Sequence, residues 1–375
     1  VKEYYDIISK KKISLLMKRI FDIFFSLVLL IILSPILLIL AILIGLAYMY
    51  ITNKLSKMNT VQLDESQLGI TAEASTKLAK YRNIAIFGVD SREDDYGKGN
   101  RSDCMIIASI NNETKEVRLI SVYRDTYVNI QGHGLDKITH AYSYGEAPLA
   151  INTLNTNLDL NISEFVTVNF DAVIAAVDSL GGVYIDIDSS EVNYINDYID
   201  ATSESSGVKS SHITHAGNQK LDGVQAVSYS RVRYTAGGDY KRTERQRLVL
   251  KKTADKLKQQ DLATLNKIID KVMPEVSTSF TTKEILSLAT GAFDYELGKT
   301  TGFPFDLETP EQIPGYSGSY VIPKGLEENV IKLHQFLYPN KDYTPTETVT
   351  DISNTLNDMT NVYPNTTESG TSQNE

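Results

Sequence analysis

A long apolar run near the amino terminus constrains this chain more than any other feature. Between Ile23 and Tyr50 the run is broken only by two serines, Pro35 and Gly45. About 20 apolar residues are enough to span a bilayer, so the run can cross one with a tilt or with a kink at the proline. The sequence therefore predicts a transmembrane anchor over residues 20–51.

The flanks of this run give the anchor a direction. Residues 1–19 carry six Lys and Arg residues against two acids, which predicts a cytoplasmic segment, with the rest of the chain outside the membrane. A cleavable signal peptide has a much shorter apolar core. The segment 18–35 resembles the membrane segment of bacterial sugar-phosphate transferases, so a re-entrant hairpin remains an alternative to a single span. Residues 52–80 are polar and are predicted to form an extracellular stalk.

Composition excludes several classes of protein. The net charge of −10 argues against a general nucleic-acid binder, because such proteins carry basic surfaces. Cys104 is the only cysteine, so the chain has no internal disulfide, and no zinc-ligand spacing occurs.

Beyond residue 80, apolar runs of strand length alternate with helical patterns. The predicted strands cover 83–89, 105–110, 117–122, 165–168 and 183–187, and the predicted helices cover 137–160, 171–180, 221–229, 240–258, 262–273, 283–293 and 326–337. This alternation is typical of an α/β sheet with helices on its faces. Residues 191–217 are polar and are predicted to be a mobile excursion. The segment 341–375 is acidic and rich in Thr, Asn and Ser, which predicts disorder.

Local signals predict where several helices begin or break. Asp171 is a good N-cap for the helix that follows it, and Pro148 predicts a break inside the long helix. Thr281 and Glu284 have the spacing of a capping box.

Charged side chains stand at the ends of three predicted strands. Asp90 and Arg92 follow the first strand, Arg101 and Asp103 precede the second, and Arg124 follows the third. Open α/β sheets bind ligands in the crevice beyond such strand ends. Carboxylates are suitable ligands for Mg²⁺, which usually takes one or two of them together with phosphates. The alternative reading of each acid alone is an ordinary turn residue.

Residues 230–247 form a second charged stretch, with five arginines around the turn Gly237-Gly238. Arginine binds phosphate oxygens with paired N–H donors, so this density predicts a site for more than one phosphate. The alternative is a solvated helix whose exposed ion pairs contribute little. Arg247 follows Gln246 on the predicted helix and is expected to face solvent.

Taken in order, these motifs resemble the LytR-CpsA-Psr (LCP) family of cell-wall phosphotransferases over residues 82–338. The motifs are Gly88-Val89-Asp90-Ser91-Arg92, Arg101-Ser102-Asp103, Arg124-Asp125-Thr126-Tyr127, Lys137-Ile138, Phe170-Asp171, Leu221-Asp222-Gly223, Ser230-Arg231-Val232-Arg233, Gly238-Asp239 and Arg242 with Arg245-Gln246. The resemblance implies a central mixed β-sheet flanked by helices over residues 81–340.

The resemblance also implies a reaction. Such proteins transfer a glycopolymer from an undecaprenyl-pyrophosphate carrier to peptidoglycan, commonly at the N-acetylmuramic acid 6-hydroxyl, outside the membrane of Gram-positive bacteria. Asp90 and Asp103 would hold Mg²⁺, with Mn²⁺ as the alternative. The remaining implied catalytic residues are Arg92, Arg101, Arg124, Arg231, Arg233, Asp239 and Arg242, and the implied substrate-binding residues are Lys137, Arg245 and Gln246.

Two other functions are compatible with the same residues. A pyrophosphatase would use the same site with water in place of the sugar hydroxyl. The second is a non-enzymatic membrane regulator of cell-wall or capsule expression. The carrier lipid needs an apolar groove, for which residues 149–160, 165–177 and 248–257 are candidates, although most of them are expected to be ordinary core.

Overall fold

The computed structural model describes residues 15–19, 21–23, 41–90, 96, 98–291, 293–310, 318–339 and 342–364. The chain divides into two compact units, residues 1–56 and residues 57–375. In the first unit residues 41–55 are helical, and much of the predicted anchor (24–40) lies outside the described residues. Within the described ranges no helix combines the length and the apolar character that a membrane span requires.

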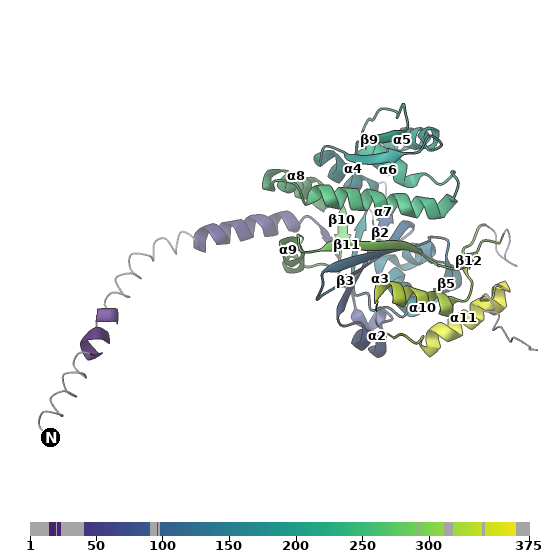
Figure 1. The fold of residues 1–375 in the computed structure, drawn as a ribbon, viewed down its shortest axis with the longest axis horizontal. Coiled ribbons are helices and arrows are strands. Elements are labelled where there is room, and N and C mark those ends of the chain that lie inside the picture. Colours follow the sequence, from purple (N-terminus) through teal and green to yellow (C-terminus); the bar gives the residue numbers. More distant parts are fainter. Residues whose placement is uncertain are drawn as a thin grey trace, which may run out of the picture. The chain divides into compact units, whose positions relative to one another are not determined.

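A seven-stranded mixed sheet organises the second unit (Figure 1). Its strand order is β1 (Asn59–Thr60), β10 (Val276–Thr278), β7 (Glu164–Val168), β2 (Tyr81–Val89), β3 (Ser102–Asn111), β4 (Glu116–Val122) and β11 (Glu296–Phe303). The pairs β1–β10, β7–β2 and β4–β11 are parallel, and the other three are antiparallel. The predicted α/β fold with a central mixed sheet is confirmed.

Successive side chains of a strand point to opposite faces, and this alternation separates two cores. On β2, Ala85 and Phe87 join the main core, whereas Ile84 joins a smaller cluster on the other face. The helices α3 (Ile138–Leu158), α10 (Leu326–Leu337) and α11 (Glu347–Thr360) contribute to the main core. The helices α7 (Gly238–Leu257) and α9 (Thr282–Thr290) cover the smaller cluster, and Figure 1 shows α7 and α3 on opposite sides of the sheet.

A third core lies beside the sheet and is built from consecutive elements. They are α4 (Phe170–Ser179), β8 (Val183–Ile187), α5 (Val192–Ser206), β9 (Gly217–Leu221) and α6 (Gly223–Arg231). The prediction of a mobile excursion over 191–217 is wrong for the part that forms α5, which buries Ile195 and Ile199 completely. These isoleucines are four residues apart, so they share one face of the helix.

Helix boundaries follow local signals, with two differences from the sequence prediction. The break in α3 falls at Gly145 and Glu146, so that Pro148 lies in the first turn of the second half, where proline is tolerated. The N-cap of α4 is Asn169, whose side chain accepts the backbone N–H of Ala172, and not Asp171. The capping box of α9 is present, with the Glu284 carboxylate accepting the N–H of Thr281.

Residues 57–80 belong to the folded unit, so the stalk prediction is wrong for them. β1 pairs with β10, and the buried side chains of Leu68 and Leu78 lie in the main core. The remaining elements are η1 (Glu65–Gln67), α2 (Ala72–Lys77), β5 (Tyr127–Ile130), β6 (Gly134–Lys137), α8 (Leu262–Val272), η2 (Met273–Glu275), β12 (Leu307–Glu308) and β13 (Ile322–Pro323).

The prediction of disorder is wrong for residues 342–364. Helix α11 buries Val349 and Leu356 completely in the main core, and Thr346 caps its first turn by accepting the N–H of Val349. Residues 365–375 lie outside the described part of the chain.

Candidate functional site

A β-bulge places the two predicted metal ligands at one end of the sheet. Gly88 pairs with Cys104 and Val89 pairs with Ser102, so Asp103 has no partner in the register. Asp90 directly follows Val89 at the end of β2 and is exposed. Bulges beside binding sites commonly redirect a side chain, and here the extra residue is a carboxylate.

Arg124 connects the bulge to the start of α3. Its Nη1 donates to Asp103 Oδ1 at 2.8 Å, and its Nε lies 3.5 Å from Asp125 Oδ2. Lys137 Nζ lies 3.2 Å from the other oxygen of Asp125 and 4.6 Å from the centroid of the Tyr320 ring. Burial by itself would lower the pKa of Arg124, but the charges of Asp103 and Asp125 outweigh this effect and raise the pKa. The guanidinium therefore stays protonated.

The first two turns of α7 bring a second charged pair to the same place. The turn before α7 requires positive φ at Gly237 and Gly238 (91° and 50°), which glycine adopts without a steric cost. Asp239 follows in the first turn, and its Oδ1 lies 2.6 Å from Arg242 Nη2. The same Nη2 approaches the backbone oxygen of Asp103 at 3.5 Å, so α7 reaches the bulge.

Several buried polar atoms at this junction have no hydrogen-bond partner among the described residues. They are Oδ2 of Asp239, Nε of Arg242 and Oε1 of Gln246. Burial raises the pKa of the Asp239 carboxyl even though Arg242 and Arg124 oppose this shift. Unpaired buried polar groups are costly and rare in native proteins, so their concentration here indicates a site that binds a charged ligand.

The structure gives two of the predicted pocket arginines internal partners. Arg231 donates to Thr202 at 2.9 Å, and its Cζ lies 4.8 Å from the centroid of the Phe170 ring and 5.1 Å from that of Tyr198. Arg245 is almost fully buried, and its nitrogens bond to Glu191 Oε1, to Thr235 and to the carbonyl oxygen of Val232. With all three nitrogens engaged, Arg245 holds α7 against α5 and offers no donor to a ligand in this state.

Two of the other predicted arginines, Arg233 and Arg101, are partly or largely exposed. Arg233 donates to the Tyr234 hydroxyl at 2.9 Å, and the charge of Arg124 acts on it. Arg101 is exposed just before β3, and its charge acts on the Tyr144 hydroxyl. Arg92 lies outside the described residues.

Sequence reasoning missed two residues of this region. Asp125 bridges Arg124 and Lys137, and its position directly after Arg124 was the available signal. The prediction that Arg247 faces solvent is wrong, because only 7% of it is exposed. Its spacing from Tyr240 and Thr243 along α7 places all three on one face, which sequence alone could have indicated.

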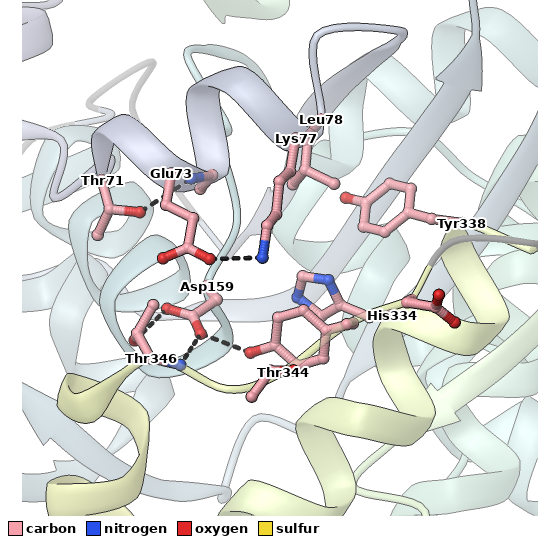
Figure 2. A pocket seen from close by; sticks show the side chains of 12 residues that line it. Thr71, Glu73, Lys77, Leu78, Asp159, His334, Tyr338, Thr344 and Thr346 are labelled. Atoms are coloured by element: carbon pink, nitrogen blue, oxygen red, sulfur yellow. Dashed lines mark hydrogen bonds and ion pairs between the residues drawn. The ribbon is translucent and has the colours of Figure 1, made fainter.

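A separate hollow lies between α2 and α10 (Figure 2), and Figure 1 shows these two helices on the opposite side of the sheet from α7. Asp159 accepts hydrogen bonds there from Thr346 and from the Tyr343 hydroxyl, and His334 stacks on the Tyr343 ring. The side chains that line this hollow come from Thr71–Leu78, Asp159 and the segment 334–346. No predicted site residue in the described part of the chain is among them.

The carboxylates at the bulge fit a magnesium ion in number and type. Within the described ranges no cluster of three or more His, Cys, Asp or Glu side chains is arranged around one point as metal ligands. Mg²⁺ needs fewer protein ligands when phosphates and water complete its shell. Asp90 and Asp103 supply hard oxygens from adjacent strands, and Asp239 adds an unpartnered buried oxygen nearby.

Comparison with known proteins places this geometry in a family. The sequence profile of the LytR_cpsA_psr family matches residues 45–299. The polyisoprenyl-teichoic acid–peptidoglycan teichoic acid transferase TagU of Enterococcus faecalis is 32% identical over 55% of this chain and 64% of its own length. The TagT transferase of Bacillus subtilis is 29% identical over 60% of this chain and 69% of its own length. The match spans about half of other curated TagU proteins, for example 49% of that of Oceanobacillus iheyensis.

Solved structures show the same fold. A structure of TagT bound to LI-WTA superposes with a TM-score of 0.56 and 26% identity, covering 74% of this chain and 99% of the TagT chain. The TagT structure of B. subtilis gives a TM-score of 0.55 at 25% identity, with the same coverage. The family profile matches more than half of the chain, and the charged bulge, the Arg124 loop and the start of α7 lie together at one place. The chain therefore belongs to the LytR-CpsA-Psr family.

Proposed function

We propose that this protein transfers a glycopolymer from a polyprenyl-pyrophosphate carrier to peptidoglycan, and that this carrier is undecaprenyl pyrophosphate. One observation carries the proposal. Asp103, Arg124, Asp239 and Arg242 meet where β2, β3 and α7 converge, and several of the buried polar atoms there have no protein partner among the described residues. The TagU and TagT relatives are named as polyisoprenyl-teichoic acid–peptidoglycan teichoic acid transferases, which is the class of reaction proposed here.

The charges of the site fit phosphoryl transfer. This reaction needs alignment and neutralisation of phosphate oxygens more than covalent help from the protein. In the proposed reaction a sugar hydroxyl oxygen bonds to the phosphorus that carries the glycopolymer. The bond from that phosphorus to the oxygen of the prenyl phosphate breaks, and the prenyl phosphate leaves. Arg124 and Arg242 stabilise the negative charge that shifts to the phosphate oxygens.

Two further roles follow from position. Asp90 and Asp103 would hold Mg²⁺, which when bound neutralises phosphate oxygens. The same two carboxylates are the candidates to accept the proton of the attacking hydroxyl. Lys137, held by Asp125, adds a positive charge beside Arg124. Arg245 acts as a positioning residue, because its bonds to Glu191 hold α7 against the start of α5 and its side chain is buried.

The face of the sheet under α7 offers a place for the prenyl chain. Many apolar side chains there are only partly buried, in contrast to the main core. They include Ile86, Val117, Val166, Leu250, Ile285, Leu288 and Leu297. Of the three predicted segments, 248–257 contributes through Leu250 and 165–177 through Val166, whereas 149–160 lies mostly in the main core.

The proposed location is the outer face of a cell membrane. The apolar run from residue 23 to residue 50 and the basic segment before it support this topology. Protease treatment of intact cells would digest the folded unit in this arrangement. Complete protection of that unit would place it in the cytoplasm and favour an intracellular regulator.

The decisive experiment incubates the full chain in detergent with lipid-linked polymer, peptidoglycan and Mg²⁺. We expect polymer linked to peptidoglycan through a phosphodiester, and loss of product with EDTA that Mg²⁺ restores. Release of free phosphorylated polymer without any wall-linked product would instead identify a pyrophosphatase. If neither product forms with any divalent cation, the enzyme proposal fails.

A further inference from the structure

A second arginine of α7 is buried with unused donors. Arg247 is 7% exposed, and within the described residues its Nε and Nη1 have no hydrogen-bond partner. The nearest acid along the helix, Glu244, is exposed and pairs with Lys241 at 2.7 Å. Burial lowers the pKa of Arg247, and Tyr123 and Glu244 oppose this shift only in part.

The position of Arg247 relates it to the charged site. Cys104 packs against the same cluster under α7 as Leu250, and the charges of Arg242 and Arg247 both act on its thiol. Cys104 directly follows Asp103 on β3, so both guanidinium groups act on the strand that carries the bulge. Arg242 already uses Nη2 for Asp239 and the Asp103 carbonyl, whereas Arg247 still has at least two free donors.

Arg247 lies farther from the amino-terminal end of α7 than Arg242 does. Five residues separate them, which corresponds to a rise of about 7.5 Å at 1.5 Å per residue. The next residue on the same face, Leu250, packs against the partly buried apolar cluster under α7. Along the helix axis Arg247 therefore lies between the charged residues at the start of α7 and Leu250, on a face rotated by about 140° from that of Arg242.

A buried guanidinium with unpaired donors is unfavourable. A guanidinium removed from water needs an anion or several acceptors to offset the desolvation. Tyr123 and Tyr240 border this region, with their ring centroids 4.7 Å apart. Burial raises the pKa of the Tyr123 hydroxyl to about 12. Tyr123 therefore stays neutral and cannot serve as the missing anion.

We propose that Arg247 is the inner anion ligand of the site and binds the phosphate group that carries the apolar prenyl chain. This inference rests on the proposed function, because it names the part of the carrier that Arg247 recognises. Arg124 and Arg242 then hold the outer phosphate, which carries the glycopolymer. When the bond between the two phosphates breaks, Arg247 stabilises the charge on the departing prenyl phosphate.

The test measures binding of farnesyl monophosphate, farnesyl pyrophosphate and inorganic phosphate to the full chain by calorimetry. We expect Arg247→Met to weaken farnesyl monophosphate binding by at least about 10-fold, the loss expected for one charge-assisted hydrogen-bonded contact. Arg124→Met should change monophosphate binding by less than about 3-fold, and both variants should weaken pyrophosphate binding by about 10-fold or more. The matched control Lys252→Met removes an exposed charge from the same helix and should change nothing.

Thermal unfolding of the ligand-free variants separates this role from a structural one. Arg247→Met should unfold at the same temperature as the wild type or higher, because it removes a buried charge without a partner. If Arg247→Met unfolds earlier, Arg247→Lys keeps the charge and should retain part of the monophosphate affinity. Equal monophosphate binding by the wild type and both Arg247 variants would overturn the inference.

The ligand set also separates the two proposals. If the wild type binds neither farnesyl compound, the proposed function itself fails. If it binds inorganic phosphate as tightly as farnesyl monophosphate, Arg247 recognises an anion without its lipid, and the assignment to the prenyl phosphate is wrong.

Discussion

Three arginines of α7 are buried, and their different partners give them different roles. Arg245 forms hydrogen bonds with a buried glutamate, a hydroxyl and a backbone carbonyl. Arg242 has one carboxylate partner and an unpartnered Nε, and Arg247 has two unpartnered nitrogens within the described structure. A paired buried charge contributes to holding the fold together, whereas an unpaired one weakens the ligand-free protein. Stability measurements can therefore separate the two kinds.

We expect Arg245→Met to destabilise the fold by about 3–5 kcal/mol, because it leaves the Glu191 carboxylate buried without its cation. Urea denaturation of the variant measures this loss. The double variant Arg245→Met, Glu191→Met removes both charges and should recover a large part of it. A loss below about 1 kcal/mol in the single variant would contradict the structural role of this pair.

Arg124→Met should act mainly on catalysis. Its partners Asp103 and Asp125 are partly exposed, and Asp125 keeps Lys137, so the expected loss of stability is about 1 kcal/mol. Transfer should fall by about 100-fold or more, since removal of one preorganised contact to transition-state charge typically costs that much. Initial rates of polymer transfer, measured beside urea unfolding, check both parts. Wild-type rates would remove Arg124 from the site.

At the scale of elements, the central strands and α10 were predictable because their apolar residues repeat with the period of the element. Helix α5 was missed because only Ile195, Ile199 and Thr202 are buried, and its other face carries Asn, Asp and Ser typical of loops. The convergence of the strand ends could be predicted from fold topology, whereas the approach of α7 to them was implied by the family resemblance. The bond between Arg245 and Glu191 could not, because 54 residues separate them and no local pattern marks the contact.

Helix α11 provides a test at this scale. Leu356→Ala should destabilise the protein by about 2–5 kcal/mol, because Leu356 is fully buried in the main core. Asn354 lies on the exposed side of the same helix, so Asn354→Ala serves as the matched control and should change stability by less than about 0.5 kcal/mol. Equal stability of the two variants would mean that α11 is not part of the cooperative fold.

At the scale of the whole molecule, the sheet separates two regions with different requirements. The α7 face carries the charged junction and partly buried apolar side chains, both of which suit an amphipathic ligand. The other face holds the largest core, which includes buried polar side chains with hydrogen-bond partners. His334 is one of them, with its Nε2 2.9 Å from the carbonyl oxygen of Leu158 and its ring stacked on Tyr343. Its protonation therefore affects the stability of the entire unit.

Burial lowers the pKa of His334 from 6.5 to about 4, against the opposing effects of the Leu158 carbonyl and Asp159. Above pH 6.5 the imidazole is neutral in both states, and its contribution to stability is fully present. As the pH falls from 6.5 towards 4, the unfolded chain takes up the proton first, so the free energy of unfolding decreases, by about 3 kcal/mol at most. Urea unfolding between pH 7.5 and pH 4.5 measures the decrease. His334→Gln keeps an N–H donor for Leu158 but cannot titrate, so its stability should fall less steeply over this range. The other four histidines are common to both proteins, and an identical slope in the variant would show that His334 takes up its proton in the folded state.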